Sequence, residues 1–297
     1  MSSIKSPERI IPTEEKNVTE KNTLYLVGTP IGNLSDITER AKKVLSEVDF
    51  IAAEDTRASG KLLSHYGIKK PLISYFEHNK RERGEVIVSR IQAGESCALI
   101  TDAGMPAISD PGEDIVRLCA EKGVTVSVVP GPCAAVSALA MSGLFTGKFL
   151  FEGFLPTGKS ERRQALDDLK DQTRTIIFYE APHKLQRTLA DLLAAFGNRK
   201  ISLCRELTKI NEEVIRTTLE GAIAYYEERE PRGEYVLIME GASVDELRAR
   251  AFWSDMSVEE HVAHYLSEGM SKNDAIKAVA RDRDVAKSEI YNQVMIK

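Results

Sequence analysis

The chain has 297 residues, and its 42% hydrophobic and 29% charged residues are typical of a folded protein with room for two domains and an appendage. No apolar run approaches the roughly 20 residues that span a bilayer, and residues 1–22 lack the apolar core of a secretory signal, so we expect a cytoplasmic protein with a disordered tail at 1–22. The net charge of −5 argues against a broad basic surface for nucleic acid, although short basic clusters occur.

An N-terminal α/β domain is expected over 23–146. Apolar strand patterns predict strands at Leu24–Val27, Asp49–Ala53, Leu72–Tyr75, Cys97–Thr101 and Thr125–Val129. Helical patterns fill the gaps, as over Ile37–Val48, for which Asp36 is the expected N-cap. Strands that alternate with helices in this way predict a parallel sheet.

Three of these strands run into loops rich in glycine and proline. The loops begin at Gly28, Thr101 and Pro130, and the longest reads TDAGMPAISDPG over Thr101–Gly112. Because open α/β sheets bind ligands at the carboxyl ends of their strands, the loops predict a small-molecule site. The spacing matches neither G-x-G-x-x-G nor a P-loop, and the longest loop has no lysine or arginine for a phosphate. An uncharged or cationic ligand therefore fits better than a nucleoside triphosphate.

A second α/β domain with a mixed sheet is expected over 147–241, followed by a linker at 242–255 and a helical module at 256–297. The expected strands are Phe149–Phe154, Thr175–Tyr179, Ile201–Cys204, Val214–Thr218 and Tyr235–Glu240. The helical module is expected to resemble a helix-turn-helix, with helices Val258–Ser267, Lys272–Arg281 and Lys287–Met295. Its basic residues suit RNA docking, whereas its acidic residues suit a packing or dimerisation module.

Cysteine and histidine spacing predicts no disulfide framework and no metal site. The cysteines, Cys97, Cys119, Cys133 and Cys204, lie in apolar or small-residue settings and are expected to be thiols in a reducing compartment. His261 and His264 are three positions apart on an expected helix, which we interpret as a surface feature.

Several segments, in this order, resemble the tetrapyrrole methylase superfamily and, within it, the family of small-subunit (16S) ribosomal RNA cytidine 2′-O-methyltransferases. The segments are LYLVGTPIGNLSDITERA (24–41), AAEDTR (52–57), SYFEHN (74–79), ALITDAGMPAISDPG (98–112), VVPGPCA (128–134), FEGFLP (151–156), FYEAPHK (178–184) and CRELTK (204–209). The resemblance implies two α/β domains with S-adenosylmethionine in the cleft between them. It also implies an enzyme that acts on ribosomal RNA of the small subunit, in the decoding region, and that forms a homodimer.

The resemblance also implies which residues contact the cofactor. They are Pro30, Asp102, Ala103, Gly104, Met105, Ile108, Cys133, Ala134, Glu180 and Leu207. Met105 stands where relatives that act on tetrapyrroles usually have aspartate, and Cys133 stands where small hydroxyl residues are common, so the individual contacts at these two positions are open.

Removal of the proton from a ribose hydroxyl calls for a general base, and Glu54, Asp55 and His78 are the candidates. A buried ion pair between Asp55 and Arg57, and a satisfied loop histidine, are the structural alternatives. Arg57 and Arg205 are candidates for RNA phosphate, with internal pairing as the alternative for Arg205. Alignment of donor and hydroxyl without a dedicated base is a further option.

Two other functions stay open at this point. One is methylation of a tetrapyrrole or another small molecule on the same fold, which the net acidity favours. The other is a ribosome-assembly protein that holds the methyl donor only as a structural ligand.

Overall fold

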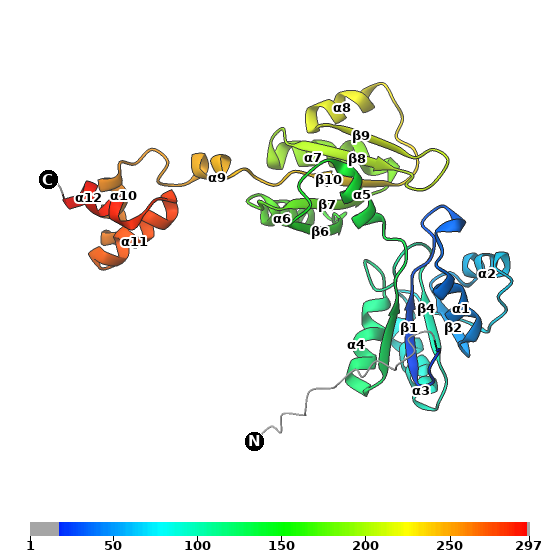
Figure 1. Ribbon diagram of the computed structural model, residues 1–297. Coiled ribbons are helices and arrows are strands. Elements are labelled where there is room, and N and C mark those ends of the chain that lie inside the picture. The colour runs from blue at the N-terminus through cyan, green and yellow to red at the C-terminus, as the bar shows by residue number, and fades with distance from the viewer. Residues whose placement is uncertain (1–17, 296–297) are drawn as a thin grey trace, which may run out of the picture.

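A computed structural model describes residues 18–295, which form two α/β domains and a separate helical module (Figure 1). Residues 1–17, most of the expected tail, and residues 296–297 lie outside the described part. Among residues 18–295, no helix combines the length and apolar character that crossing a membrane requires.

The first sheet has five parallel strands in the order β3-β2-β4-β1-β5, which confirms the predicted parallel sheet. The strands are β1 (Thr23–Val27), β2 (Phe50–Ala53), β3 (Leu72–Ser74), β4 (Cys97–Ile100) and β5 (Thr125–Val129). Helices α1 (Glu39–Glu47) and α2 (Thr56–His65) cover one face, and α3 (Lys80–Gln92) and α4 (Gly112–Lys122) cover the other. Burial on both faces explains why the central strands are continuous apolar runs.

The first helix begins later than the sequence predicts. Asp36 is not its N-cap: Leu34–Asp36 forms a short 3-10 turn, η1, capped by Asn33. The cap of α1 is Thr38, whose hydroxyl accepts a hydrogen bond from the backbone N–H of Ala41. Asp36 and Thr38 both have side chains that can cap a helix. Because Asp36 is part of η1, Thr38 becomes the N-cap of α1.

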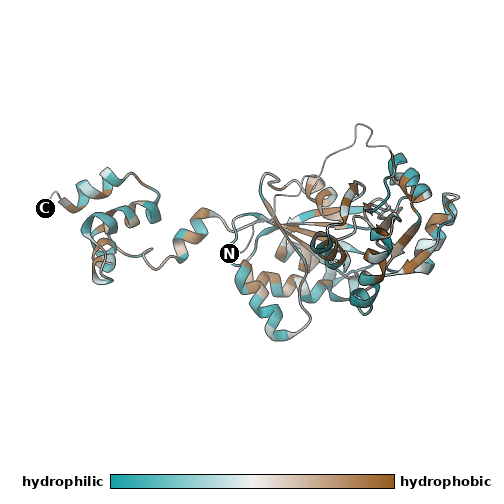
Figure 2. Cartoon of the chain, turned by 90° about the horizontal axis from the view of Figure 1, so that it is seen from below, coloured by the Kyte–Doolittle hydropathy of each residue, from teal (hydrophilic) through white to brown (hydrophobic). Residues whose placement is uncertain are grey.

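The second sheet is mixed, as expected, with the order β6-β7-β10-β8-β9. Its strands are β6 (Phe149–Phe154), β7 (Thr175–Glu180), β8 (Lys200–Arg205), β9 (Glu213–Thr218) and β10 (Tyr235–Met239). Strands β6 and β7 are parallel, and β10 lies antiparallel between β7 and β8. Helices α6 (Lys159–Leu169), α7 (Leu185–Phe196) and α8 (Leu219–Glu227), with the short turn η2 (Pro182–Lys184) before α7, complete the domain. Figure 2 shows the hydrophobic strands enclosed by more hydrophilic helices.

Helix α5 (Ala134–Ser142) joins the two domains. It follows β5 directly, yet its buried Ala138 and Leu139 pack against Ile177 and Ile238 of the second sheet. The domain division expected near residue 146 therefore assigns to the first domain a helix that shares its core with the second.

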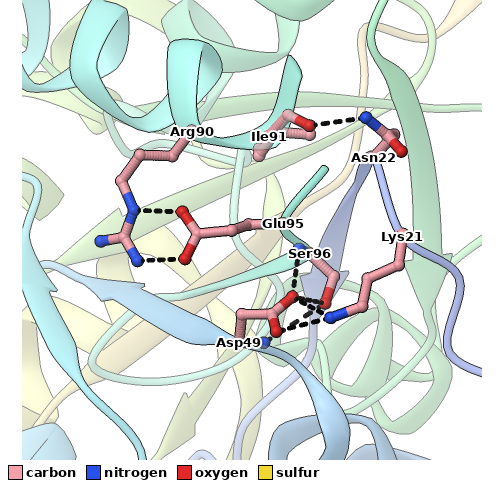
Figure 3. A network of polar contacts seen from close by, with 7 residues as sticks. All are labelled: Lys21, Asn22, Asp49, Arg90, Ile91, Glu95 and Ser96. Carbon is pink, nitrogen blue, oxygen red and sulfur yellow. Dashed lines mark hydrogen bonds and ion pairs between the residues drawn. The ribbon is translucent and has the colours of Figure 1, made fainter. Parts of the chain in front are cut away.

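The amino ends of the strands in the first sheet are tied by a polar network (Figure 3). Asp49 accepts hydrogen bonds from the backbone N–H and the hydroxyl of Ser96, at 2.6 and 2.7 Å, and pairs with Lys21 at 2.6 Å. Arg90 and Glu95 form a two-pronged ion pair beside it. Lys21 thus falls within the tail that we expected to be disordered, and its ion pair holds it to the domain.

The C-terminal module consists of α10 (Val258–Ser267), α11 (Lys272–Arg283) and α12 (Lys287–Met295) around a small apolar core. Figures 1 and 2 both show it apart from the α/β domains, joined to them through α9 (Val244–Arg250), which lies in the expected linker. His261 is fully buried, which corrects the surface assignment. Trp253 stacks on its ring, with centroids 5.4 Å apart, and Arg283 donates to its Nδ1.

Candidate functional site

A cavity of about 530 Å³ lies where the loops of the first domain face the second sheet. Its walls come from the loops after β1, β2, β4 and β5 and from the neighbouring ends of β6, β7, β8 and β10. Most of the residues implied for the cofactor line it, together with one candidate base. These lining residues are Glu54, Ala103, Gly104, Met105, Ile108, Cys133, Ala134, Glu180 and Leu207.

Glycines allow the loops of the first domain to meet. A Cβ atom on Gly28 would lie 2.7 Å from the Cα atom of Gly131, so side chains are excluded where the loops after β1 and β5 cross. Thr29 and Gly104 exchange two backbone hydrogen bonds, 2.9 and 3.1 Å long, which fix the loop after β4 against the loop after β1. The loops after β1, β4 and β5 are therefore fixed to one another through their backbone.

The long loop after β4 is held in a strained form by Asp110. Ala107 and Ser109 adopt left-handed backbone angles, with φ values of 67° and 61°. Asp110 Oδ1 accepts hydrogen bonds from the N–H groups of Ala107 and Gly112, at 2.9 and 2.7 Å, and closes the turn. Burial raises the pKa of this carboxyl, which also lines the cavity.

Glu180 is a buried carboxylate in the opposite wall, only 4% exposed. Its Oε1 accepts a hydrogen bond from the N–H of Ala181 at 2.8 Å, and its Oε2 accepts one from the hydroxyl of Thr188 on α7. That hydroxyl in turn accepts from Arg162 Nη2 at 2.7 Å, and Arg162 pairs with Asp191 at 2.6 Å. The chain of contacts fixes the orientation of the Glu180 side chain.

Glu54 is the candidate base that faces the cavity. Burial raises the pKa of its carboxyl, and the negative charges of Asp102 and Asp110 raise it further. The hydroxyl of Thr101, another cavity residue, donates to Glu54 Oε2 at 3.1 Å. The carboxyl group thus faces the cavity and is held there by a hydrogen bond from Thr101.

Asp55, the neighbouring candidate, is the N-cap of α2. Its Oδ1 accepts hydrogen bonds from the N–H groups of Arg57 and Ala58, at 2.7 and 3.3 Å, which lower the pKa of the carboxyl. Arg57 lies 4.0 Å away with its side chain 93% exposed, so the pair is no buried ion pair. Asp102 is exposed, and its Oδ1 accepts from the N–H of Asp55 at 3.3 Å.

The remaining predicted residues do not line the cavity. Pro30 is buried directly before Ile31, which does line it. His78 is exposed in the loop after β3, edge-on to Phe76. Arg205 pairs with Glu213 at 3.2 Å, which is the internal alternative for this arginine.

Four further cavity residues, Phe154, Tyr179, His183 and Lys209, were not singled out from the sequence. Each stands in a segment that carries the family resemblance, which is the signal that marked their neighbourhood. Lys209 does not supply a free positive charge, because its Nζ is paired with Glu206 at 2.9 Å and with Glu234 at 3.0 Å. Carboxylates and apolar side chains therefore dominate the cavity, a composition that suits a cationic ligand with an apolar part.

Comparison with known proteins agrees with this architecture. Residues 23–223 match the family model of the tetrapyrrole (corrin/porphyrin) methylases. A protein of Halalkalibacterium halodurans named Ribosomal RNA small subunit methyltransferase I is 50% identical over 92% of this chain and 94% of its own length. A Bacillus subtilis protein of the same name is 45% identical over 94% of this chain and 96% of its own.

Solved structures show the same fold at low identity. A cobalt precorrin-4 methyltransferase, 18% identical, superposes with a TM-score of 0.55 over 74% of this chain and 95% of its own. A diphthine synthase, 14% identical, gives a TM-score of 0.57 over 74% of this chain and 90% of its own. With its two sheets, its inter-domain cavity and these relatives, the chain belongs to the tetrapyrrole methylase family, in the group of proteins named Ribosomal RNA small subunit methyltransferase I.

Proposed function

We propose that this protein is an S-adenosylmethionine-dependent methyltransferase of small-subunit ribosomal RNA and that it acts, as a homodimer, on the ribose 2′-hydroxyl of a cytidine in the decoding region. The carrying observation is a cavity lined by carboxylates, in a chain whose relatives of high identity are named for methylation of small-subunit ribosomal RNA. The family model is named for tetrapyrrole substrates, but the relatives with high identity are named for ribosomal RNA, and we therefore prefer RNA as the substrate.

The residues present fit S-adenosylmethionine, whose sulfonium supplies an electrophilic methyl group. Ala103, Gly104 and Met105, which follow Asp102, line the cavity, and the small residues among them let a ligand approach the backbone closely. Ile108, Cys133, Ala134 and Leu207 supply apolar contacts, and Pro30 is buried directly before Ile31, another cavity residue. Glu180 supplies a fixed negative charge for a cationic ligand.

Glu54 is the residue we assign to the acceptor hydroxyl. It lines the cavity, whereas Asp55 is occupied as a helix cap and His78 lies outside the lining. A carboxyl with a raised pKa is a better proton acceptor than an ordinary one, and a positioned base typically accelerates such a step by about 10²–10⁴. Arg57, whose side chain is 93% exposed three residues after Glu54, is the arginine we assign to RNA phosphate.

The direct test is transfer of label from S-adenosylmethionine to small ribosomal subunits from cells that lack this gene, followed by nuclease mapping. Label on a cytidine ribose is expected with the unaltered protein. Glu54→Gln is expected to lower kcat by at least about 10²-fold, and Asp55→Asn, the matched neighbour, by far less.

Two outcomes would redirect the proposal. Tight binding of S-adenosylmethionine without transfer to subunits or to free ribosomal RNA would leave a small-molecule acceptor. Transfer that survives Glu54→Gln unchanged would assign the acceleration to alignment of donor and hydroxyl and would remove Glu54 from the proton transfer.

A further inference from the structure

A large aromatic side chain stands exposed in the cavity. Phe154, the last residue of β6, lines the cavity and is 59% exposed. Burial of a phenyl ring is strongly favoured in water, so an open ring inside a ligand site is a contact surface for a ligand. None of the contacts proposed for S-adenosylmethionine involves Phe154.

A β-bulge turns this ring toward the site. Strand β6 pairs Phe151 with Ile177 and Phe154 with Tyr179 on β7, so three residues of β6 oppose two of β7. In a regular strand, residues three apart point to opposite faces. The extra residue places Phe151 and Phe154 on one face, and Gly153 absorbs the bend with a φ of 74°.

The ring is also held in place from behind. Tyr179 makes edge-to-face contacts with both Phe151 and Phe154, with ring centroids 5.1 and 5.6 Å apart. The Tyr179 hydroxyl is itself fixed, because it accepts a hydrogen bond from the N–H of Ala135 at 3.2 Å. Phe154 is therefore a supported platform with one free face, and little side-chain freedom is lost when a flat group covers it.

We propose that Phe154 is a stacking platform for a nucleobase of the RNA, at or next to the methylated nucleotide. This assignment rests on the proposed function. Single-stranded nucleic acid is bound where aromatic rings that take bases stand beside cations that take the backbone. Here Lys159 begins α6 five residues after Phe154, and Arg163 on the same helix is 85% exposed although it lies 3.7 Å from Asp167. Arg57, whose side chain is 93% exposed, stands three residues after the cavity residue Glu54.

The test compares Phe154→Ala with Phe154→Trp, with Phe149→Ala as the control. Phe149 is 43% exposed at the other end of the same strand and does not line the cavity. Steady-state methylation of small subunits from cells that lack this gene gives KM and kcat, and calorimetry gives the Kd of S-adenosylmethionine. Phe154→Ala is expected to raise the KM for subunits about 5- to 150-fold, the usual loss of one base stack, with cofactor Kd within about twofold. Phe154→Trp is expected to keep the original KM.

The outcomes separate this proposal from the proposed function. If the unaltered protein does not methylate subunits, the proposed function fails first and this inference with it. If it does, three results overturn the platform alone. They are an unchanged KM in Phe154→Ala, a cofactor Kd weakened as much as the subunit KM is raised, and a loss of the dimer in sedimentation that accounts for the lost activity.

Discussion

Thr188→Val tests how the buried carboxylate of the site is held. The hydroxyl of Thr188 donates to Glu180 and accepts from Arg162, and the residue is only 1% exposed. Valine keeps the shape but removes both contacts, which leaves a buried carboxylate oxygen and a buried guanidinium N–H without that partner. Thr188→Ser is the matched control, because it keeps the hydroxyl and loses one methyl group.

The expected cost follows from these contacts. Hydrogen bonds to charged groups contribute about 1.5–3 kcal/mol each. Glu180 keeps the N–H of Ala181 and Arg162 keeps Asp191, so we expect valine to lower the free energy of unfolding by about 2–4 kcal/mol. Thr188→Ser is expected to lower the free energy of unfolding by about 1 kcal/mol, because one buried methyl group is lost.

Urea unfolding of both variants measures the difference, and calorimetry with S-adenosylmethionine measures its effect on the site. Valine is expected to be the less stable variant by at least about 1 kcal/mol and to bind the cofactor more weakly, because Glu180 loses its fixed orientation. If Thr188→Val is as stable as Thr188→Ser and binds the cofactor equally well, the contact chain does not organise Glu180.

Two further predictions concern opposite ends of the first sheet. Although partial burial opposes it, hydrogen bonds from Lys21 and Ser96 lower the pKa of Asp49 from 3.8 to about 2, so its ionised form stabilises the fold above about pH 4 and this contribution is lost as the pH falls toward 2. Asp49→Asn is expected to lower the free energy of unfolding by about 2 kcal/mol at pH 7. If urea titrations show the same difference from the unaltered protein at pH 2, the prediction is wrong. Gly131→Ala places a Cβ 2.9 Å from the Cα of Gly28 and is expected to weaken S-adenosylmethionine binding at least about tenfold in calorimetry. Gly60→Ala, where the nearest atom is 3.7 Å away, is the control, and equal affinities in the two variants would exclude a role for the glycine crossing.

The central strands of the first sheet were predictable because strands that are buried on both faces are apolar along their whole length, as β2 and β4 are. Strand Thr125–Val129 and helix Val258–Ser267 have the bounds that the pattern predicts. The loops after β1 and β4 were predictable as well, since close backbone approach at Gly28 and Gly104 demands residues without side chains.

Roles that depend on distant contacts were not predictable. The pattern at 54–57 offers two adjacent carboxylates, and only the start of α2 shows that Asp55 is used by the helix while Glu54 is left to the cavity. His261 has polar neighbours on its own helix, but its ring is covered by Trp253, which precedes that helix, and by Arg283 of α11.

The strand that carries Phe154 shows how a correct element can still leave the site undetermined. The predicted and observed bounds of β6 coincide at Phe149–Phe154. Alternation along a regular strand would put Phe151 and Gly153 on one face and turn Phe154 away from it. The pairing with β7 contains one extra residue, which reverses that assignment and brings Phe154 beside Tyr179. A bulge is fixed by the partner strand and by the approach of Ser109 to Gly153, both remote in sequence, so the side chain that faces the ligand is decided by tertiary structure.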